Sequence, residues 1–61
     1  MNAIAISDYY AVSKDEISIK KGDKLKNVVP KRDYWVEGEI VISKKRGVFP
    51  ESYIRVRILI F

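Results

Sequence analysis

Apolar residues along this chain alternate with polar ones or form short β-branched runs. Such segments lie at 3–6, 17–19, 28–29, 40–42 and 54–58. A period of two with Val, Ile and Tyr is typical of strands, and no window shows an apolar helical face bounded by capping residues. We therefore predict five short strands, near residues 2–7, 23–29, 34–42, 46–50 and 54–58, which form a small all-β sandwich or barrel.

The connections between these strands carry their own signals. Gly22, within 20–23, stands where a tight turn needs a positive φ. The polar segment 30–33 begins with proline and is expected to be a loop, and 43–46, with Gly47 behind it, is expected to be a hairpin tip. Segment 8–16 is long and lacks alternation, so we expect an extended surface loop, the kind of segment that usually carries function in a small scaffold.

Composition limits how this small domain is stabilised and what it can do. The chain has 61 residues and contains neither Cys nor His. It is one domain at most, and a domain of this size buries only about 60% of its unfolded surface. A disulfide framework is excluded and a zinc site is disfavoured, so we expect no metal and no cofactor. The sequence shows no phosphate-cradling Gly loop and no sign of a buried carboxylate pair, which argues against an enzyme.

Charge and hydropathy indicate a compartment but no particular partner. No apolar run is long enough to span a bilayer, and the N-terminus lacks the features of a signal peptide. We therefore expect a cytoplasmic location. Twelve Lys and Arg against eight Asp and Glu give a net charge of +4, which tolerates acidic partners without naming one.

Four segments, in order along nearly the whole chain, resemble motifs of the Src-homology-3 (SH3) family. AISDY at 5–9 resembles the family's Ala-Leu-Tyr-Asp-Tyr, and DEISIKKGDKL at 15–25 resembles its Asp-Glu-Leu-Ser-Phe-x-x-Gly-Asp-x-Leu. WVEGE at 35–39 resembles Trp-Trp-x-Gly-Glu, and GVFPESYI at 47–54 resembles Gly-x-Phe-Pro-Ser-Asn-Tyr-Val. Each motif alone is weak, but the four together, with family-like spacing, are a strong signal.

The resemblance implies both a fold and a binding activity. The fold is a five-stranded, mostly antiparallel β-barrel of two packed sheets, with a long RT loop and a short 3-10 turn before the last strand. The activity is binding of proline-rich Pro-x-x-Pro segments in the polyproline II form, whose stiffness keeps the entropy lost on binding small. The resemblance further implies a single SH3 domain over 1–61 that is part of a larger signalling or cytoskeletal protein, such as an adaptor, a class I myosin tail or a GTPase exchange factor.

The motifs assign roles to particular residues. The proline groove is expected to be formed by Tyr9, Trp35, Pro50 and Tyr53, and Val48, with Phe49 in part, packs behind it. Two of these groove assignments have an alternative without a binding role. Trp35 would instead be a core residue, and the Tyr9 ring would only pack on its own loop. Asp15 and Glu16 in the long loop are expected to take the ligand's basic residue, unless they form a solvated loop tip. Further assignments are a ligand-facing hydroxyl on Ser52 and a core that includes Ala5, Ile17, Ile19, Leu25 and Val48.

Three positions depart from the family pattern. Ser7 replaces a Tyr that walls one dipeptide pocket, so that pocket is expected to be shallower, and Tyr34 is a possible replacement wall from the other side. Asn27 stands where the family buries an aliphatic residue. Either Asn27 is buried with hydrogen-bond partners, or the strand is locally shifted and Val28 takes the core position.

The basic residues support a competing function. Lysines and an arginine lie in two predicted turns away from the groove, and the simplest interpretation is a solubilising surface. The alternative is a basic small barrel that binds anionic membrane or nucleic acid. We expect no nucleic-acid binding, because a platform for bases needs aromatic side chains among the basic ones. The residues concerned are Lys20, Lys21, Lys44, Lys45 and Arg46, while Lys31 and Arg32 lie nearer the groove and are expected to disfavour a very basic ligand. We also expect a monomer.

Overall fold

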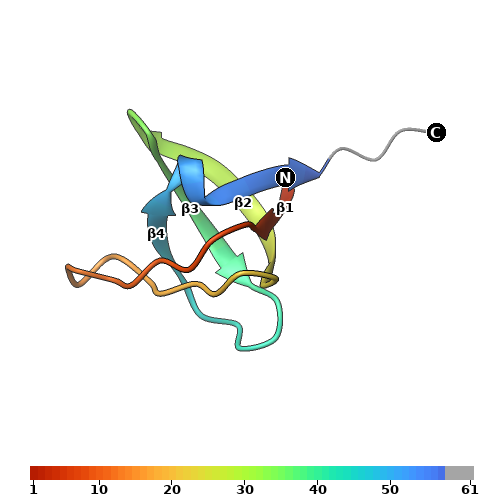
Figure 1. Ribbon diagram of the computed structural model, residues 1–61. Coiled ribbons are helices and arrows are strands. Elements are labelled where there is room, and N and C mark those ends of the chain that lie inside the picture. The colour runs from red at the N-terminus through yellow and green to blue at the C-terminus, as the bar shows by residue number, and fades with distance from the viewer. Residues whose placement is uncertain (58–61) are drawn as a thin grey trace.

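Five antiparallel strands form one continuous sheet in the computed structural model, which describes residues 1–57 (Figure 1). The sheet has the order β4-β3-β2-β1-β5. The prediction of a five-stranded all-β fold is confirmed. The predicted end of the fifth strand, at residue 58, lies outside the described residues. The elements are β1 (Asn2–Ala5), β2 (Lys24–Arg32), β3 (Trp35–Ile40), β4 (Arg46–Pro50), the 3-10 turn η1 (Glu51–Tyr53) and β5 (Ile54–Arg57).

The sheet curls because its two outermost strands are consecutive in the chain. Strand β4 lies at one end of the order and β5 at the other, yet only the three residues of η1 separate them. Such a short link brings the two ends of the sheet together, as in a small barrel. The 3-10 turn directly follows β4, whose neighbour in the sheet is β3. The side chains of the turn therefore lie near those at the start of β3.

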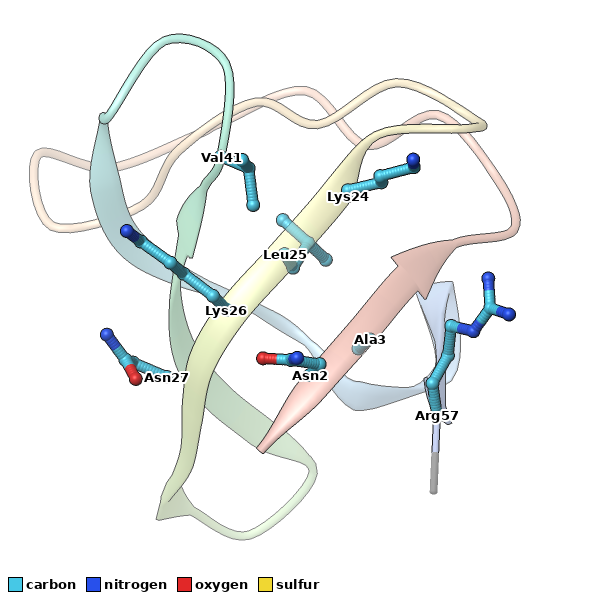
Figure 2. Close-up of a pocket in the computed structure, with 8 residues that line it drawn as sticks. All are labelled: Asn2, Ala3, Lys24, Leu25, Lys26, Asn27, Val41 and Arg57. Atoms are coloured by element: carbon cyan, nitrogen blue, oxygen red, sulfur yellow. The ribbon is translucent and has the colours of Figure 1, made fainter. Parts of the chain in front are cut away.

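A bulge in β2 decides between the two predictions made for Asn27. The β2–β3 register runs from Lys26 opposite Glu39 to Val29 opposite Glu37, so two residues of β2 face one of β3. Asn27 has a φ of 53° and is exposed, and its side chain points away from β1 (Figure 2). Asn tolerates this left-handed conformation better than most residues. Val28 therefore takes the core position, where it is buried.

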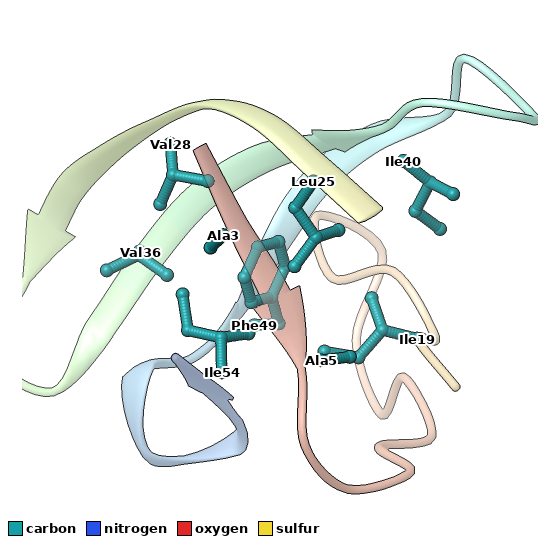
Figure 3. Close-up of a cluster of buried hydrophobic side chains, with 9 residues drawn as sticks. All are labelled: Ala3, Ala5, Ile19, Leu25, Val28, Val36, Ile40, Phe49 and Ile54. Atoms are coloured by element: carbon teal, nitrogen blue, oxygen red, sulfur yellow. The ribbon is translucent and has the colours of Figure 1, made fainter. Parts of the chain in front are cut away.

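The core lies inside the curl and is centred on Phe49, which is fully buried (Figure 3). Side chains alternate between the two faces of β3. Val36, Gly38 and Ile40 face inward, while Trp35, Glu37 and Glu39 face outward. Val48 is also buried, but Ile17 is only half-buried and packs at the margin of the core, so its core assignment holds in part. The cluster comprises Ala3, Ala5, Ile19, Leu25, Val28, Val36, Ile40, Phe49 and Ile54.

The long loop predicted over 8–16 is one arm of a longer loop that connects β1 to β2. Its two arms run side by side (Figure 1) and are joined where the Tyr9 and Ile19 backbones exchange hydrogen bonds of 2.8 and 2.9 Å. The loop then docks on β4, because Val48 N–H donates to the Asp15 carbonyl (2.9 Å) and Ile17 N–H donates to the Val48 carbonyl (3.1 Å). The loop thus pairs with the edge of β4 that β3 leaves open.

The connections are partly as predicted. Gly22 has a φ of 95°, as the tight turn requires. The prediction of a loop over 30–33 is wrong, because β2 continues to Arg32 and pairs it with Trp35, leaving only Asp33 and Tyr34 as the tip. The β3–β4 turn lies at 41–45, and Arg46 belongs to β4 rather than to the tip.

Candidate functional site

Four half-buried residues with rings form one continuous surface on the outside of the barrel. The Tyr9 ring lies edge-on to Trp35 (centroids 6.2 Å apart, 81° between planes) and to Tyr53 (5.1 Å, 69°). Trp35 and Pro50 are paired neighbours on β3 and β4, and η1 carries Tyr53 just beyond Pro50. Residues from three separate motifs thus meet, and we call Tyr9, Trp35, Pro50 and Tyr53 the ring surface.

Backbone bonds hold the edges of this surface. Ile6 N–H donates to the Tyr53 carbonyl (2.9 Å), which ties the start of the long loop to η1. Glu51 N–H donates to the Tyr34 carbonyl (2.9 Å), which ties η1 to the β2–β3 tip. Ser52 is exposed on η1, so its hydroxyl is accessible beside Tyr53.

Ser7 and Tyr34 lie at the edges of the ring surface. Ser7 is exposed and directly follows Ile6, so the position of the family's missing Tyr is adjacent to Tyr53. Tyr34 is 82% exposed at a φ of 67°. Its ring makes no aromatic contact with the ring surface within residues 1–57.

Glu16 is committed to its own loop. Its carboxylate accepts hydrogen bonds from the Tyr9 hydroxyl (2.5 Å), the Ser13 hydroxyl (2.5 Å) and the Val12 N–H (2.9 Å). Three donors on one carboxylate leave little capacity for a ligand. Glu16 therefore fixes the orientation of the Tyr9 ring, a role that sequence reasoning missed although the Ser13-x-x-Glu16 spacing within a turn hinted at it.

Asp15 faces outward and meets a cation from the opposite side. Its side chain is 56% exposed, and one carboxylate oxygen lies 4.0 Å from Nη1 of Arg32 at the end of β2. Arg32 also lies over Trp35, with Cζ 5.2 Å from the ring centroid. Sequence reasoning placed Arg32 near the groove but missed both contacts, because they depend on β2 extending to this residue.

The bonds around Glu16 shift two pKa values in opposite directions. The pKa of Glu16 is lowered from 4.5 to about 2, first because the Ser13 hydroxyl donates to the carboxylate and next because the Tyr9 hydroxyl does. The pKa of Tyr9 is raised from 10.0 to about 12, chiefly because its hydroxyl donates to Glu16. At neutral pH both bonds are therefore intact.

These shifts predict a pH dependence of folding stability. The depressed pKa of Glu16 contributes stability that is present above pH 4.5 and is lost as the pH falls toward about 2. The raised pKa of Tyr9 contributes stability that is present below pH 10 and is lost as the pH rises toward about 12. We expect Glu16→Gln to be less stable than the wild type at pH 7 and the two to converge near pH 2, as measured by urea unfolding.

Glu51→Gln is the matched control for this experiment. It also removes one carboxylate, but the Glu51 side chain forms no ion pair or hydrogen bond within residues 1–57 and is exposed. Its stability relative to the wild type should stay constant between pH 7 and pH 2. An acid loss that is equally steep in wild type and Glu16→Gln would contradict the role assigned to Glu16.

Two other hollows carry basic residues. One, of about 390 Å³, lies beside β1 and β2 and is bordered by Lys24, Lys26 and Arg57. These three side chains point in different directions around it (Figure 2), and Lys26 is paired with Glu39 (3.6 Å). The other, of about 270 Å³, is lined among others by Lys20, Lys45, Tyr10 and Ile42, so the two basic turns meet around exposed apolar side chains.

Residues 1–57 contain no cluster of acidic side chains suited to hold a metal ion. The same residues include no helix long and apolar enough to cross a membrane. The ring surface offers its own binding chemistry: flat apolar faces, an indole N–H and a neighbouring carboxylate.

The sequence profile of the SH3 domain family matches residues 4–51, which is more than half of the chain. The chain belongs to the SH3 domain family, and SH3 domains are protein–protein interaction modules without enzymatic activity. Cell division control protein 15 of Schizosaccharomyces pombe is 43% identical over 54 residues, which cover 85% of this chain and 6% of that protein. Nebulette of Homo sapiens is 38% identical over 50 residues, which cover 82% of this chain and 5% of that protein.

Solved structures of similar shape are also SH3 domains. The SH3 domain of the yeast actin binding protein Abp1 superimposes with a TM-score of 0.89 at 29% identity, covering 95% of this chain and all of that one. The C-terminal SH3 domain of myosin IB from Entamoeba histolytica, bound to an EhFP10(GEF) peptide, superimposes with a TM-score of 0.82 at 25% identity. That match covers 98% of this chain and 86% of the myosin domain. The resemblance inferred from the four motifs is thus confirmed.

Proposed function

We propose that this domain binds proline-rich Pro-x-x-Pro segments of other proteins that carry a flanking basic residue. The observation that supports this most directly is the ring surface, where Tyr9, Trp35, Pro50 and Tyr53 lie side by side on the outside of the barrel. Proline rings pack against flat aromatic faces, and a polyproline II segment is already stiff before it binds. The Trp35 indole N–H and the Ser52 hydroxyl can donate to its carbonyl groups.

The flanking basic residue would bind beside Trp35, near the long loop. Asp15 supplies the accessible carboxylate there, while Glu16 acts indirectly by holding Tyr9. A short peptide on a shallow surface is expected to bind with a dissociation constant of around 1 μM, or about −8 kcal/mol.

We also propose that the domain is one part of a larger cytoplasmic protein with a signalling or cytoskeletal role. Its curated relatives support this, because the chain spans only 6% of cell division control protein 15 and 5% of nebulette. An actin binding protein and a myosin are among the structural matches. We propose a monomeric module that binds no nucleic acid.

A second candidate function, binding to anionic membrane, draws on one observation. The hollow between the two basic turns combines Lys20 and Lys45 with exposed Tyr10 and Ile42, so one aromatic ring does lie among basic side chains. The ring surface has one basic side chain, Arg32, but it also has the accessible carboxylate of Asp15 beside it, and this is why peptide binding is the favoured function.

A chemical-shift titration of the labelled domain tests the proposal. The probes are proline-rich peptides with Arg at either end, anionic vesicles and an oligonucleotide, each at low and high salt. Shifts at the Trp35 indole, Tyr9 and Tyr53 that persist at high salt would support peptide binding. Shifts at Lys20 and Lys45 with vesicles or oligonucleotide alone, lost at high salt, would refute it in favour of anion binding.

Replacement of Ser7 by Tyr tests the shape of the groove. Ser7 lies next to the Ile6–Tyr53 bond, so a ring at this position adds a wall beside Tyr53. We expect Ser7→Tyr to tighten binding of a proline-rich peptide by about two- to tenfold, the range for one added aromatic contact. Isothermal titration calorimetry measures the change.

Ser43→Tyr serves as the control, since Ser43 lies in the β3–β4 turn, at the far end of the hairpin from Trp35 and Pro50. It should leave the affinity unchanged. Equal affinity of the Ser7→Tyr variant and the wild type would mean that another side chain already closes that pocket.

A further inference from the structure

Arg32 occupies the place where a ligand's basic residue would bind. Its Cζ lies 5.2 Å from the Trp35 ring centroid, and its Nη1 lies 4.0 Å from the Asp15 carboxylate. The guanidinium group thus lies over an aromatic ring and has a carboxylate near one of its nitrogens, a combination that suits a guanidinium group. Strand β2 thus places an arginine of the domain itself between Trp35 and Asp15, the two residues that we propose to bind the basic residue of the ligand.

Neighbouring residues show that this placement is particular to Arg32. Lys31 precedes it on β2, at a second shift in the β2–β3 register, and its Nζ lies 3.4 Å from Glu37. Glu37 in turn accepts from Arg46 Nε at 3.1 Å. Two adjacent cations of the same strand therefore have different partners, and only Arg32 contacts the ring surface.

Other acidic groups of the long loop offer the ligand no substitute for Asp15. Glu16 is held by three donors. Asp8 accepts from Lys21 N–H (2.8 Å) and Asp23 from Lys20 N–H (2.8 Å), so both brace the base of the loop. Within residues 1–57, Asp15 is therefore the acidic residue of this loop that a cation beside Trp35 can reach.

We propose that Arg32 is a specificity-determining residue that competes with the basic residue of the ligand for Asp15 and Trp35. This inference rests on the proposed function. The Arg32 and Asp15 side chains are 52% and 56% exposed and their charges are 4.0 Å apart, so water screens the pair and a ligand can displace it. A basic flanking residue of the ligand consequently contributes less binding free energy than it would if Arg32 did not occupy the position between Asp15 and Trp35.

The experiment compares two peptides that share one proline-rich core, one with a flanking Arg and one with Gln in its place. Arg32→Gln keeps a long polar stem but removes the charge. We expect it to tighten binding of the Arg peptide by about two- to fivefold, the range for one exposed ion pair, and to leave the Gln peptide unchanged. Lys31→Gln removes the same charge from the neighbouring position and should affect the two peptides equally.

The outcomes separate the inference from the function on which it rests. If both peptides bind the wild type but Arg32→Gln changes them by the same factor, the function stands and the inference is wrong. The inference is equally wrong if Arg32→Gln weakens the Arg peptide, because Arg32 would then help to hold it. If neither peptide binds any variant, the proposed function itself fails, and the inference fails with it.

Discussion

Trp35→Ala is expected to remove measurable binding of proline-rich peptides while leaving a cooperatively folded domain. Trp35 begins β3 on the outer face, where its ring contacts Tyr9 and Arg32 lies over it, so it joins the ring surface to the Arg32–Asp15 pair. Central tryptophans at interfaces typically contribute 2 kcal/mol or more, which corresponds to a loss of about 30-fold or greater. Calorimetry with the Arg-flanked peptide measures the loss, and urea unfolding reports the fold.

The neighbouring residue provides a matched control on the opposite face. Val36 is buried and belongs to the core cluster, so Val36→Ala should destabilise the domain by about 1–3 kcal/mol, somewhat less than a larger aliphatic residue truncated to Ala. The molecules that remain folded should bind peptide as the wild type does. If Trp35→Ala instead unfolds the domain and Val36→Ala abolishes binding, the faces of β3 have been assigned the wrong way round.

Local patterns were sufficient to predict most of the fold. Alternation predicted five strands, because a half-buried strand must place every second side chain in the core. Gly22 predicted its turn since a positive φ is easiest for glycine. The four residues of the ring surface were predicted by the family motifs, and the structure brings them together, although peptide binding by them remains a prediction.

Features that depend on contacts distant in sequence were not predictable in the same way. Polarity and a leading proline favoured a loop at 30–33, but pairing with β3 carries β2 through to Arg32. The sequence offered Asp15 and Glu16 as equivalent carboxylates. Only the fold of the loop shows that Glu16 turns toward Tyr9 and Ser13, while Asp15 faces Arg32.

Gly47→Ala is expected to have the second large effect, because Gly47 lies where the long loop docks on β4. A Cβ atom at this position would lie 2.5 Å from Cγ2 of Ile17 and 3.0 Å from the Asp15 carbonyl oxygen. Neither neighbour yields easily, since the Ile17 side chain is β-branched and the carbonyl belongs to the backbone. Overpacking of this kind costs about 1–3 kcal/mol, so the urea midpoint should fall clearly below that of the wild type.

The same substitution should also disturb the binding site. The loop must move away from β4 to admit the methyl group, which weakens the bonds from Val48 N–H to Asp15 and from Ile17 N–H to Val48. Asp15, which pairs with Arg32, and Glu16, which orients Tyr9, move with the loop. We expect faster hydrogen exchange at the Ile17 and Val48 amides and weaker binding of the Arg-flanked peptide.

Gly38→Ala distinguishes this coupling from a general loss of stability. A Cβ at Gly38 would lie 3.0 Å from both Phe49 and Val28, so its nearest neighbours belong to the core and not to the long loop. It should lower the urea midpoint while leaving exchange at the Ile17 amide, relative to global unfolding, as in the wild type. If Gly47→Ala gives the same pattern as Gly38→Ala, the position of the loop does not depend on its contact with β4, and the binding site is held by its own hydrogen bonds alone.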